Sequence, residues 1–254
     1  MRVSFVVVSV ADRIEQLNTL VDSIIAQPKF DKIELNLMFQ GPQSVAELIR
    51  NRGRYTNVFV VPDKLGCHGA RVELLRLIQY DVYINLDDDI ELTQHTDYAA
   101  PIQHCLNPGT GFVLTNWART PELLLKKVPA MKPAFVPQIL VYQGGGMVYA
   151  DKIGALMRAL PATKQTFDTA WPLTAYLNGY TNYRFLGSLA VHRVCTTGGM
   201  SAYLDETPVQ TMLERYVRYR RAKRQRGNGH DILIPLDADV LPAARAMHKT
   251  NLKR

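Results

Sequence analysis

The sequence predicts an α/β fold in which helices flank a mostly parallel central sheet, with a basic helical extension at the C-terminus. Three observations support this prediction. Apolar, β-branched runs alternate with segments of helical spacing over the first 92 residues, and such alternation is typical of parallel strands joined by right-handed crossovers. Polar residues follow the strand-like runs at their carboxyl ends, where ligands bind in such sheets. The surplus of positive charge is concentrated near the C-terminus.

The elements of the first part follow in chain order. Val3–Val10 is an apolar, β-branched run interrupted only by two small serines, which indicates a strand buried on both faces. Further strands are expected at Ile33–Phe39, Val58–Val61 and Val82–Leu86. Apolar residues at helical spacing predict the intervening helices, which are Arg13–Ala26, Ser44–Arg52 and Ala70–Gln79.

After Leu92 the pattern is less regular. We expect a strand at Gly111–Thr115 and a long proline-rich loop from Pro121 to Pro137. The later elements are expected to be helices at Asp151–Leu160 and Phe167–Asn178, a strand at Phe185–Val191, and a helix from Thr207 to Arg226. These elements suggest a domain of residues 1–205, with halves 1–92 and 93–205, and an extension of residues 206–254.

Length and composition exclude several classes of protein. Of the 254 residues, 47% are hydrophobic and 21% are charged, which excludes disordered, collagen-like and coiled-coil chains. No run of about 18 apolar residues occurs, so no membrane span is expected. The apolar N-terminus lacks a small-residue cleavage site before Asp12, so we interpret it as a strand rather than a signal peptide. Three scattered cysteines are too few for a disulfide framework, and we expect a cytoplasmic protein, in the host cytoplasm if it is viral.

Three adjacent carboxylates, Asp87, Asp88 and Asp89, directly follow the expected strand Val82–Leu86. Like charges at a strand end repel one another unless a cation binds there. Mg²⁺ and Mn²⁺ prefer such oxygen ligands, often together with phosphate oxygens. Because side chains alternate along an extended segment, Asp87 and Asp89 are expected on one side and Asp88 on the other. The alternative interpretation is a solvated acidic turn.

Other polar residues also fall at strand ends. Asp12, Gln40 and Asp63 each follow or end an expected strand. The carboxyl ends of parallel strands meet at one edge of a sheet, so these residues and the aspartates are expected to form a polar crescent there.

Five segments occur in a characteristic order. They are Gly66–Arg71 with its Ala-Arg pair, the Asp87–Asp89 triplet, Gly144–Tyr149, Phe167-Asp168 followed by Leu177–Tyr180, and Val191-His192. Over about residues 1–195 this series resembles the glycosyltransferases of the GT-A fold, a Rossmann-like fold, and especially glycosyltransferase family 2. Two segments depart from the family pattern. Gln40-Gly41 stands where an acidic residue is frequent, and Phe167-Asp168 stands where Glu-Asp is common.

The resemblance implies a metal-dependent enzyme that transfers a sugar from a nucleotide-sugar, most readily a UDP-sugar, to an acceptor hydroxyl. Residues 1–92 would bind the nucleotide and residues 93–205 the acceptor. Mn²⁺ or Mg²⁺ would be held by Asp87, Asp89 and His192 against the diphosphate. Asp168 would be the general base of an inverting reaction. The donor contacts would come from Asp12, Gln40, Asp63, Arg71, Asp88, Gly144, Gly145 and Gly146.

Some of these residues also have a structural interpretation: a helix cap for Asp168, a strand-end histidine for His192, a surface helix residue for Arg71, and a flexible turn for the three glycines.

The charge of the C-terminal extension bears on the acceptor. Residues 215–254 hold 11 Lys and Arg and 3 Asp, which leaves 19 basic and 20 acidic residues for the rest. Phosphates would relieve the repulsion within the cationic cluster that includes Arg215, Arg218, Arg221 and Arg224. Nucleic acid suits basic side chains with nearby aromatic residues. One hypothesis is therefore an acceptor on a hydroxymethylated base in DNA, as for some phage-type enzymes of this fold, with Trp171, Tyr142 or Tyr149 stacking on the flipped base.

Four alternatives stay open at this stage. The enzyme could act on polysaccharide or glycolipid at a membrane surface, or be a sugar-nucleotide nucleotidyltransferase. The chain could instead be a non-catalytic nucleic-acid-binding protein, or the extension could be only a solvated basic face. The sequence predicts neither the donor sugar nor the oligomeric state.

Overall fold

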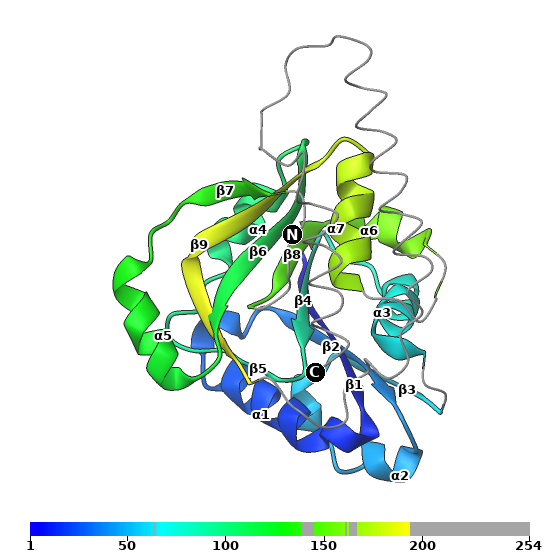
Figure 1. Ribbon diagram of the computed structural model, residues 1–254. Coiled ribbons are helices and arrows are strands. Elements are labelled where there is room, and N and C mark those ends of the chain that lie inside the picture. Colours follow the sequence, from blue (N-terminus) through cyan, green and yellow to red (C-terminus); the bar gives the residue numbers. More distant parts are fainter. Residues whose placement is uncertain (63–64, 139–144, 161, 163–166, 194–254) are drawn as a thin grey trace.

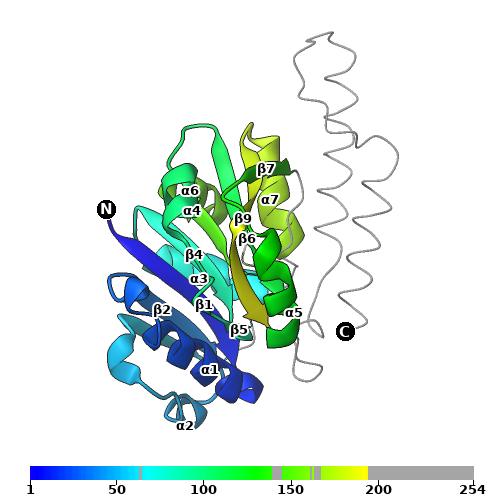
Figure 2. The ribbon, with the colours of Figure 1, turned by 90° about the vertical axis from the view of Figure 1, so that its left-hand side faces the viewer.

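The computed structural model describes residues 1–62, 65–138, 145–160, 162 and 167–193, with the backbone alone for residues 167–170. The expected helix Thr207–Arg226 and the whole basic extension lie outside these ranges, and the expected domain boundaries stay predictions. The described residues form a nine-stranded sheet. Its strands run in the order β3-β2-β1-β4-β8-β6-β9-β5, and β7 pairs with β9 (Figure 1). Helices flank the sheet, as the view turned by 90° shows (Figure 2). This is the expected α/β architecture.

The first part of the sheet is parallel, as predicted. Its strands are β1 (Val3–Val10), β2 (Glu34–Gln40), β3 (Asn57–Val61) and β4 (Val82–Asp87). The connecting helices are α1 (Ile14–Ile25), α2 (Gln43–Ala46) and α3 (Gly66–Leu77). Every residue of β1 is buried, because strands pair on both of its edges and helices cover both of its faces. The carboxyl ends of these strands form the edge at which ligands were expected.

The second part of the sheet is mixed. It contains β5 (Ile90–Glu91), β6 (Thr110–Ala118), β8 (Met147–Ala150) and β9 (Thr181–His192). Strand β8 is antiparallel to β4 and β6, β6 is parallel to β9, and β5 is antiparallel to β9. The helices of this part are α4 (Ala99–Cys105), α6 (Asp151–Arg158) and α7 (Phe167–Leu177). The pairing of β5 with β9 places His192 opposite Ile90, one residue beyond the aspartate triplet.

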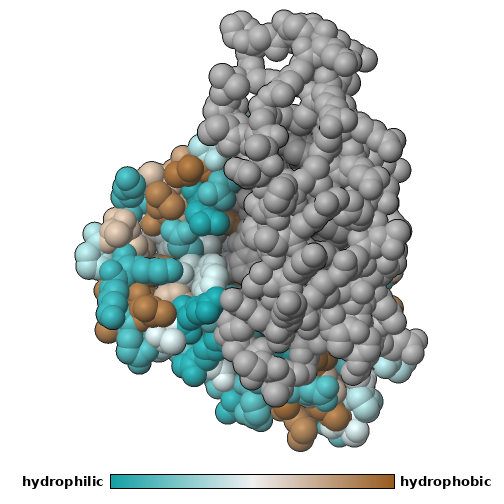
Figure 3. All heavy atoms as spheres, in the orientation of Figure 1, coloured by the Kyte–Doolittle hydropathy of each residue, from teal (hydrophilic) through white to brown (hydrophobic). Residues whose placement is uncertain are grey.

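The prediction of a loop from Pro121 to Pro137 is wrong. The segment forms α5 (Pro121–Lys127), a 3₁₀ turn, and β7 (Phe135–Gln138) on the left of Figure 1. Thr120 caps α5 by accepting a hydrogen bond from the Leu123 amide (3.3 Å), and Pro121 occupies the first turn, where no amide donor is needed. Prolines thus start a helix here, and β7 tolerates its own proline as a strand at the margin of the sheet. Figure 3 shows hydrophilic and hydrophobic side chains interleaved on the left of the view, the side of α5 and β7.

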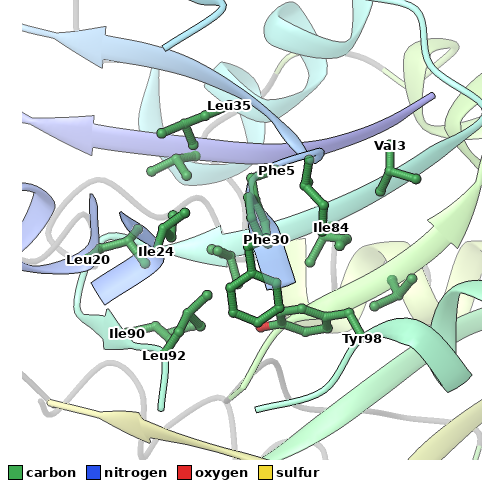
Figure 4. Close-up of a cluster of buried hydrophobic side chains, with 14 of the residues drawn as sticks. Val3, Phe5, Leu20, Ile24, Phe30, Leu35, Ile84, Ile90, Leu92 and Tyr98 are labelled. Atoms are coloured by element: carbon green, nitrogen blue, oxygen red, sulfur yellow. The ribbon is translucent and has the colours of Figure 1, made fainter. Parts of the chain in front are cut away.

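Two hydrophobic cores lie on opposite faces of the sheet. One packs α1 and α4 against β1, β2 and β4, and the other packs α3, α6 and α7 against the second face. In the first core Phe5, Phe30 and Tyr98 meet with ring centroids 5.7–5.9 Å apart (Figure 4). Burying each such ring contributes about 1.5–3 kcal/mol, so this cluster fixes the position of the loop that follows β5.

None of the helices in the described ranges combines the length and the apolar character that crossing a membrane requires.

Candidate active site

The three aspartates occupy the end of β4 and the turn into β5. Their side chains are 21%, 2% and 8% exposed for Asp87, Asp88 and Asp89. Asp88 turns into the protein, where the Ser9 hydroxyl donates a hydrogen bond to its Oδ2 (2.7 Å). Asp87 and Asp89 share the other side, as expected from the alternation of an extended chain.

His192 joins these two carboxylates from the far half of the sequence. Ligand atoms of Asp87, Asp89 and His192 all lie within 4.8 Å of one another, and His192 Nε2 is 3.1 Å from Asp89 Oδ1. The indole of Trp117 packs edge-on against the imidazole, with ring centroids 5.2 Å apart. The two carboxylates are ligands that suit Mn²⁺ or Mg²⁺, and the imidazole offers a third ligand atom beside them. The structure therefore brings together the three residues that were expected to hold a metal.

Asp87 and Asp89, the two carboxylates that face the metal position, each contact a buried arginine. Arg71 is fully buried in α3, and its guanidinium donates to Asp87 Oδ1 (2.6 Å) and to the Leu86 carbonyl (3.2 Å). We expected Arg71 to contact the donor, but its burial makes it a support for Asp87 instead. Arg13 contacts Asp88 Oδ1 (3.0 Å) and Asp89 Oδ2 (2.6 Å).

Arg13 was not among the residues expected at the site. Arg13 could have been found from its position directly after the first strand, beside Asp12, because that strand ends at the same edge of the sheet as the strand before the aspartates.

Burial and charge shift the pKa values of Asp88 and Asp89 in opposite directions. Burial raises the pKa of Asp88 to about 7, although Arg13 opposes this effect. Burial also acts to raise the pKa of Asp89, but hydrogen bonds and charges from His192 and Arg13 outweigh it, so that pKa lies below its ordinary value. Asp89 is therefore the carboxylate that stays ionised and ready to bind a cation.

The glycine segment is shaped by packing within the protein. A Cβ at Gly145 would lie 2.2 Å from the Asn116 carbonyl, and one at Gly146 would lie 2.7 Å from the Tyr98 hydroxyl. That hydroxyl donates to the Gly145 carbonyl at 2.6 Å. Gly145 and Gly146 are thus glycines because β6 and Tyr98 approach them closely. Gly144 lies outside the described residues.

Two of the remaining residues that were expected to contact the donor, Gln40 and Asp12, lie at the same edge of the sheet. Gln40 ends β2 and is buried, whereas Asp12 is exposed in the 3₁₀ turn Ala11–Arg13 directly after β1. Asp63 lies outside the described residues. A cavity of about 280 Å³ opens beside Asp89, between α1 and the segment Ile90–Glu91.

The expected acceptor residues have different outcomes. Trp171 is fully buried in the second core, and its indole N–H donates to His68 Nδ1 at 3.0 Å. Its ring faces are covered by protein, which contradicts the expectation that it stacks on an acceptor base. Asp168 lies in the first turn of α7, and its side chain is outside the description. Also outside it are the extension residues Arg215, Arg218, Arg221 and Arg224.

Comparisons with known proteins establish the fold. No protein-family model matches the chain, and no curated protein matches its sequence. Among solved structures, the chain is similar to S. aureus TarS 1–349 in complex with UDP-GlcNAc, with TM-score 0.60, 15% identity and 84% of the chain covered. It is also similar to the mannosyltransferase PcManGT of Pyrobaculum calidifontis in complex with GDP-Man and Mn²⁺, with TM-score 0.58, 16% identity and 80% covered. A third similar structure is GalNAc-T7 with UDP, GalNAc and Mn²⁺, with TM-score 0.62, 15% identity and 98% covered.

These likenesses confirm the expected GT-A fold. The chain spans 64%, 59% and 55% of the length of those three structures, respectively.

Proposed function

We propose that this protein is a metal-dependent glycosyltransferase that uses a nucleotide-sugar donor. The observation that carries the proposal is the cluster of Asp87, Asp89 and His192 at the carboxyl edge of a GT-A sheet. The structurally similar TarS, PcManGT and GalNAc-T7 structures contain UDP-GlcNAc, GDP-Man with Mn²⁺, and UDP with Mn²⁺. A UDP-sugar with Mn²⁺ or Mg²⁺ is therefore the donor and cofactor pair that we expect for this chain.

The leaving group explains why a cation belongs at this edge. Breaking the bond between sugar and diphosphate leaves additional negative charge on the diphosphate, and a bound divalent cation would offset it. The three aspartates contact two buried arginines, Arg13 and Arg71. Because three carboxylates outnumber two guanidinium groups, the cluster keeps an excess of negative charge when all three carboxylates are ionised. The chain's own part is to hold Asp87 and Asp89 in place and to keep Asp89 ionised.

The acceptor hydroxyl must lose a proton during the reaction, and we assign Asp168 as the general base. The resemblance of Phe167-Asp168 to the acidic segment of GT-A glycosyltransferases supports this assignment, and Asp168 lies in the first turn of α7. A base that acts directly on the acceptor would make the enzyme inverting.

For the acceptor we retain the hypothesis of a hydroxymethylated base in DNA. The cationic residues of the extension, Arg215, Arg218, Arg221 and Arg224, support it through their affinity for phosphates. A cytoplasmic location, expected from the few cysteines, is part of the same proposal. Incubation with labelled UDP-sugars and hydroxymethylated duplex DNA should label the DNA. Transfer to a glycolipid or to polysaccharide instead would replace this acceptor but keep the enzyme class.

Calorimetry tests the donor site. UDP should bind more tightly with Mn²⁺ than with EDTA, and Asp89→Asn or His192→Gln should abolish this difference. Asp31→Asn, a change at an exposed aspartate, is the matched control and should bind like the unsubstituted chain. Equal UDP binding with and without Mn²⁺ by the unsubstituted chain would contradict the proposal.

A further inference from the structure

Arg13 reaches the aspartate triplet from a different strand. It follows β1, whereas the aspartates follow β4, and its side chain is only 10% exposed. One terminal nitrogen of its guanidinium contacts both Asp88 Oδ1 (3.0 Å) and Asp89 Oδ2 (2.6 Å). Arg13 thereby links the carboxylate that turns inward to one that faces the metal position.

The contacts of Asp89 divide between its two oxygens. Arg13 contacts Oδ2, and the imidazole of His192 lies 3.1 Å from Oδ1. Oδ1 is therefore the oxygen beside the third ligand. A carboxylate anchored at one oxygen cannot rotate freely, so the other oxygen keeps a fixed direction. Partners that orient ligands in this way typically change metal affinity about 10- to 100-fold.

Arg13 is itself held in place. Asp88 binds the guanidinium, and Ser9 in turn donates to Asp88 Oδ2 at 2.7 Å. The chain Ser9–Asp88–Arg13–Asp89 thus runs from the core strand β1 to the metal position. Asp88 was expected to contact the donor, and its burial suits this internal role better.

We propose that Arg13 is a positioning residue that orients Asp89 for the divalent cation, with Asp88 as its anchor. The inference rests on the proposed function, since it concerns the same metal position. An arginine beside a cation site also opposes the cation by charge, so a test has to separate orientation from charge.

The double substitution Arg13→Met with Asp88→Asn makes this separation. Binding is measured at about pH 8.5, where Asp88 is ionised, so the double variant removes one positive and one negative group together and leaves the formal local charge unchanged while the anchor of Asp89 is lost. Replacing a buried ion pair by neutral side chains of similar size is commonly tolerated. Arg13→Lys is a second variant that keeps the charge but loses the planar fork. Arg50→Met, at an exposed arginine paired with Asp22, is the control.

The readout is Mn²⁺ binding to the full chain, followed by the electron paramagnetic resonance signal of free Mn²⁺. Thermal unfolding of each variant reports whether it is folded. We expect the double variant to bind Mn²⁺ about 10- to 100-fold more weakly than the unsubstituted chain, Arg13→Lys to be weakened to a lesser extent, and Arg50→Met to be unchanged.

A folded double variant that binds Mn²⁺ as tightly as the unsubstituted chain would overturn the inference and leave the proposed function standing. If the double variant does not fold, Arg13→Lys decides the matter in the same way. Absence of Mn²⁺ binding by the unsubstituted chain would instead overturn the proposed function, and the inference with it.

Discussion

Replacing Gly146 with alanine tests the packing behind the glycine segment. Gly146 has φ +127°, a conformation that costs other residues about 1–3 kcal/mol. Its new Cβ would lie 2.7 Å from the Tyr98 hydroxyl. Tyr98 is buried and donates to the Gly145 carbonyl, so displacing the hydroxyl leaves that carbonyl unpaired at a further cost of about 1–3 kcal/mol. The expected loss in the free energy of unfolding is therefore about 2–6 kcal/mol.

Gly179→Ala is the matched control for this prediction. Gly179 also has a positive φ (+88°), but a Cβ there would meet nothing within 4 Å. It should therefore show only the backbone part of the cost. Urea unfolding of both variants, followed by circular dichroism, measures the difference. If Gly146→Ala is as stable as Gly179→Ala, then Tyr98 does not enforce the glycine and the packing argument is wrong.

Three further predictions concern two side-chain hydrogen bonds and one buried carboxylate. Trp171→Phe removes the indole donor to His68 Nδ1 and should lower the free energy of unfolding by about 1–3 kcal/mol, and urea titration that finds no loss would contradict the hydrogen bond. Burial raises the pKa of Asp88 to about 7, so folding favours the protonated form of its carboxyl group. The free energy of unfolding that this proton contributes should therefore decline as the pH rises from about 4 to about 7. Urea unfolding in EDTA should show this decline in the unsubstituted chain but not in Asp88→Asn, and parallel pH profiles would refute the assignment. Thr120→Ala removes the cap of α5 and should cost about 0.5–2 kcal/mol by the same titration, whereas Thr120→Ser should preserve most of the stability.

The sequence predicted the parallel part of the fold well because its signals are local. Apart from Ser4 and Ser9, Val3–Val10 is apolar on both alternating sets of positions, and only a strand covered on both faces requires that pattern. The helix that became α1 was evident from apolar residues spaced along one face. Neither feature depends on partners far away in the chain.

The segment from Pro121 to Pro137 shows where this reasoning fails. Its prolines are compatible with a loop, with the first turn of a helix and with a strand at the sheet margin. The burial of Leu124 against β6 and β9 and the pairing of Phe135–Gln138 with β9 decide among them, and those contacts are made by residues distant in sequence. Local pattern alone could not have selected the correct structure.

The residues that face the metal position could be predicted from the sequence, whereas the buried residues behind them could not. Asp87 and Asp89 were evident from alternation after a strand, and His192 entered through a family resemblance. Arg13 and the inward turn of Asp88 depend on the pairing of β1 with β4, which sets one strand end against the other. Trp171 was misjudged because an aromatic side chain in an amphipathic helix can face either the core or a ligand, and here the partner His68 holds it in the core.

The antiparallel pairing of β5 with β9 also bears on how the protein folds. Asp89 and His192 lie about a hundred residues apart, so their meeting closes one of the longest loops in the described chain. Loop closure of this kind is entropically costly and tends to occur late. A three-ligand cation position can therefore exist only after β9 has paired with β5. Uptake of Mn²⁺ during refolding would then report completion of the domain rather than its first collapse.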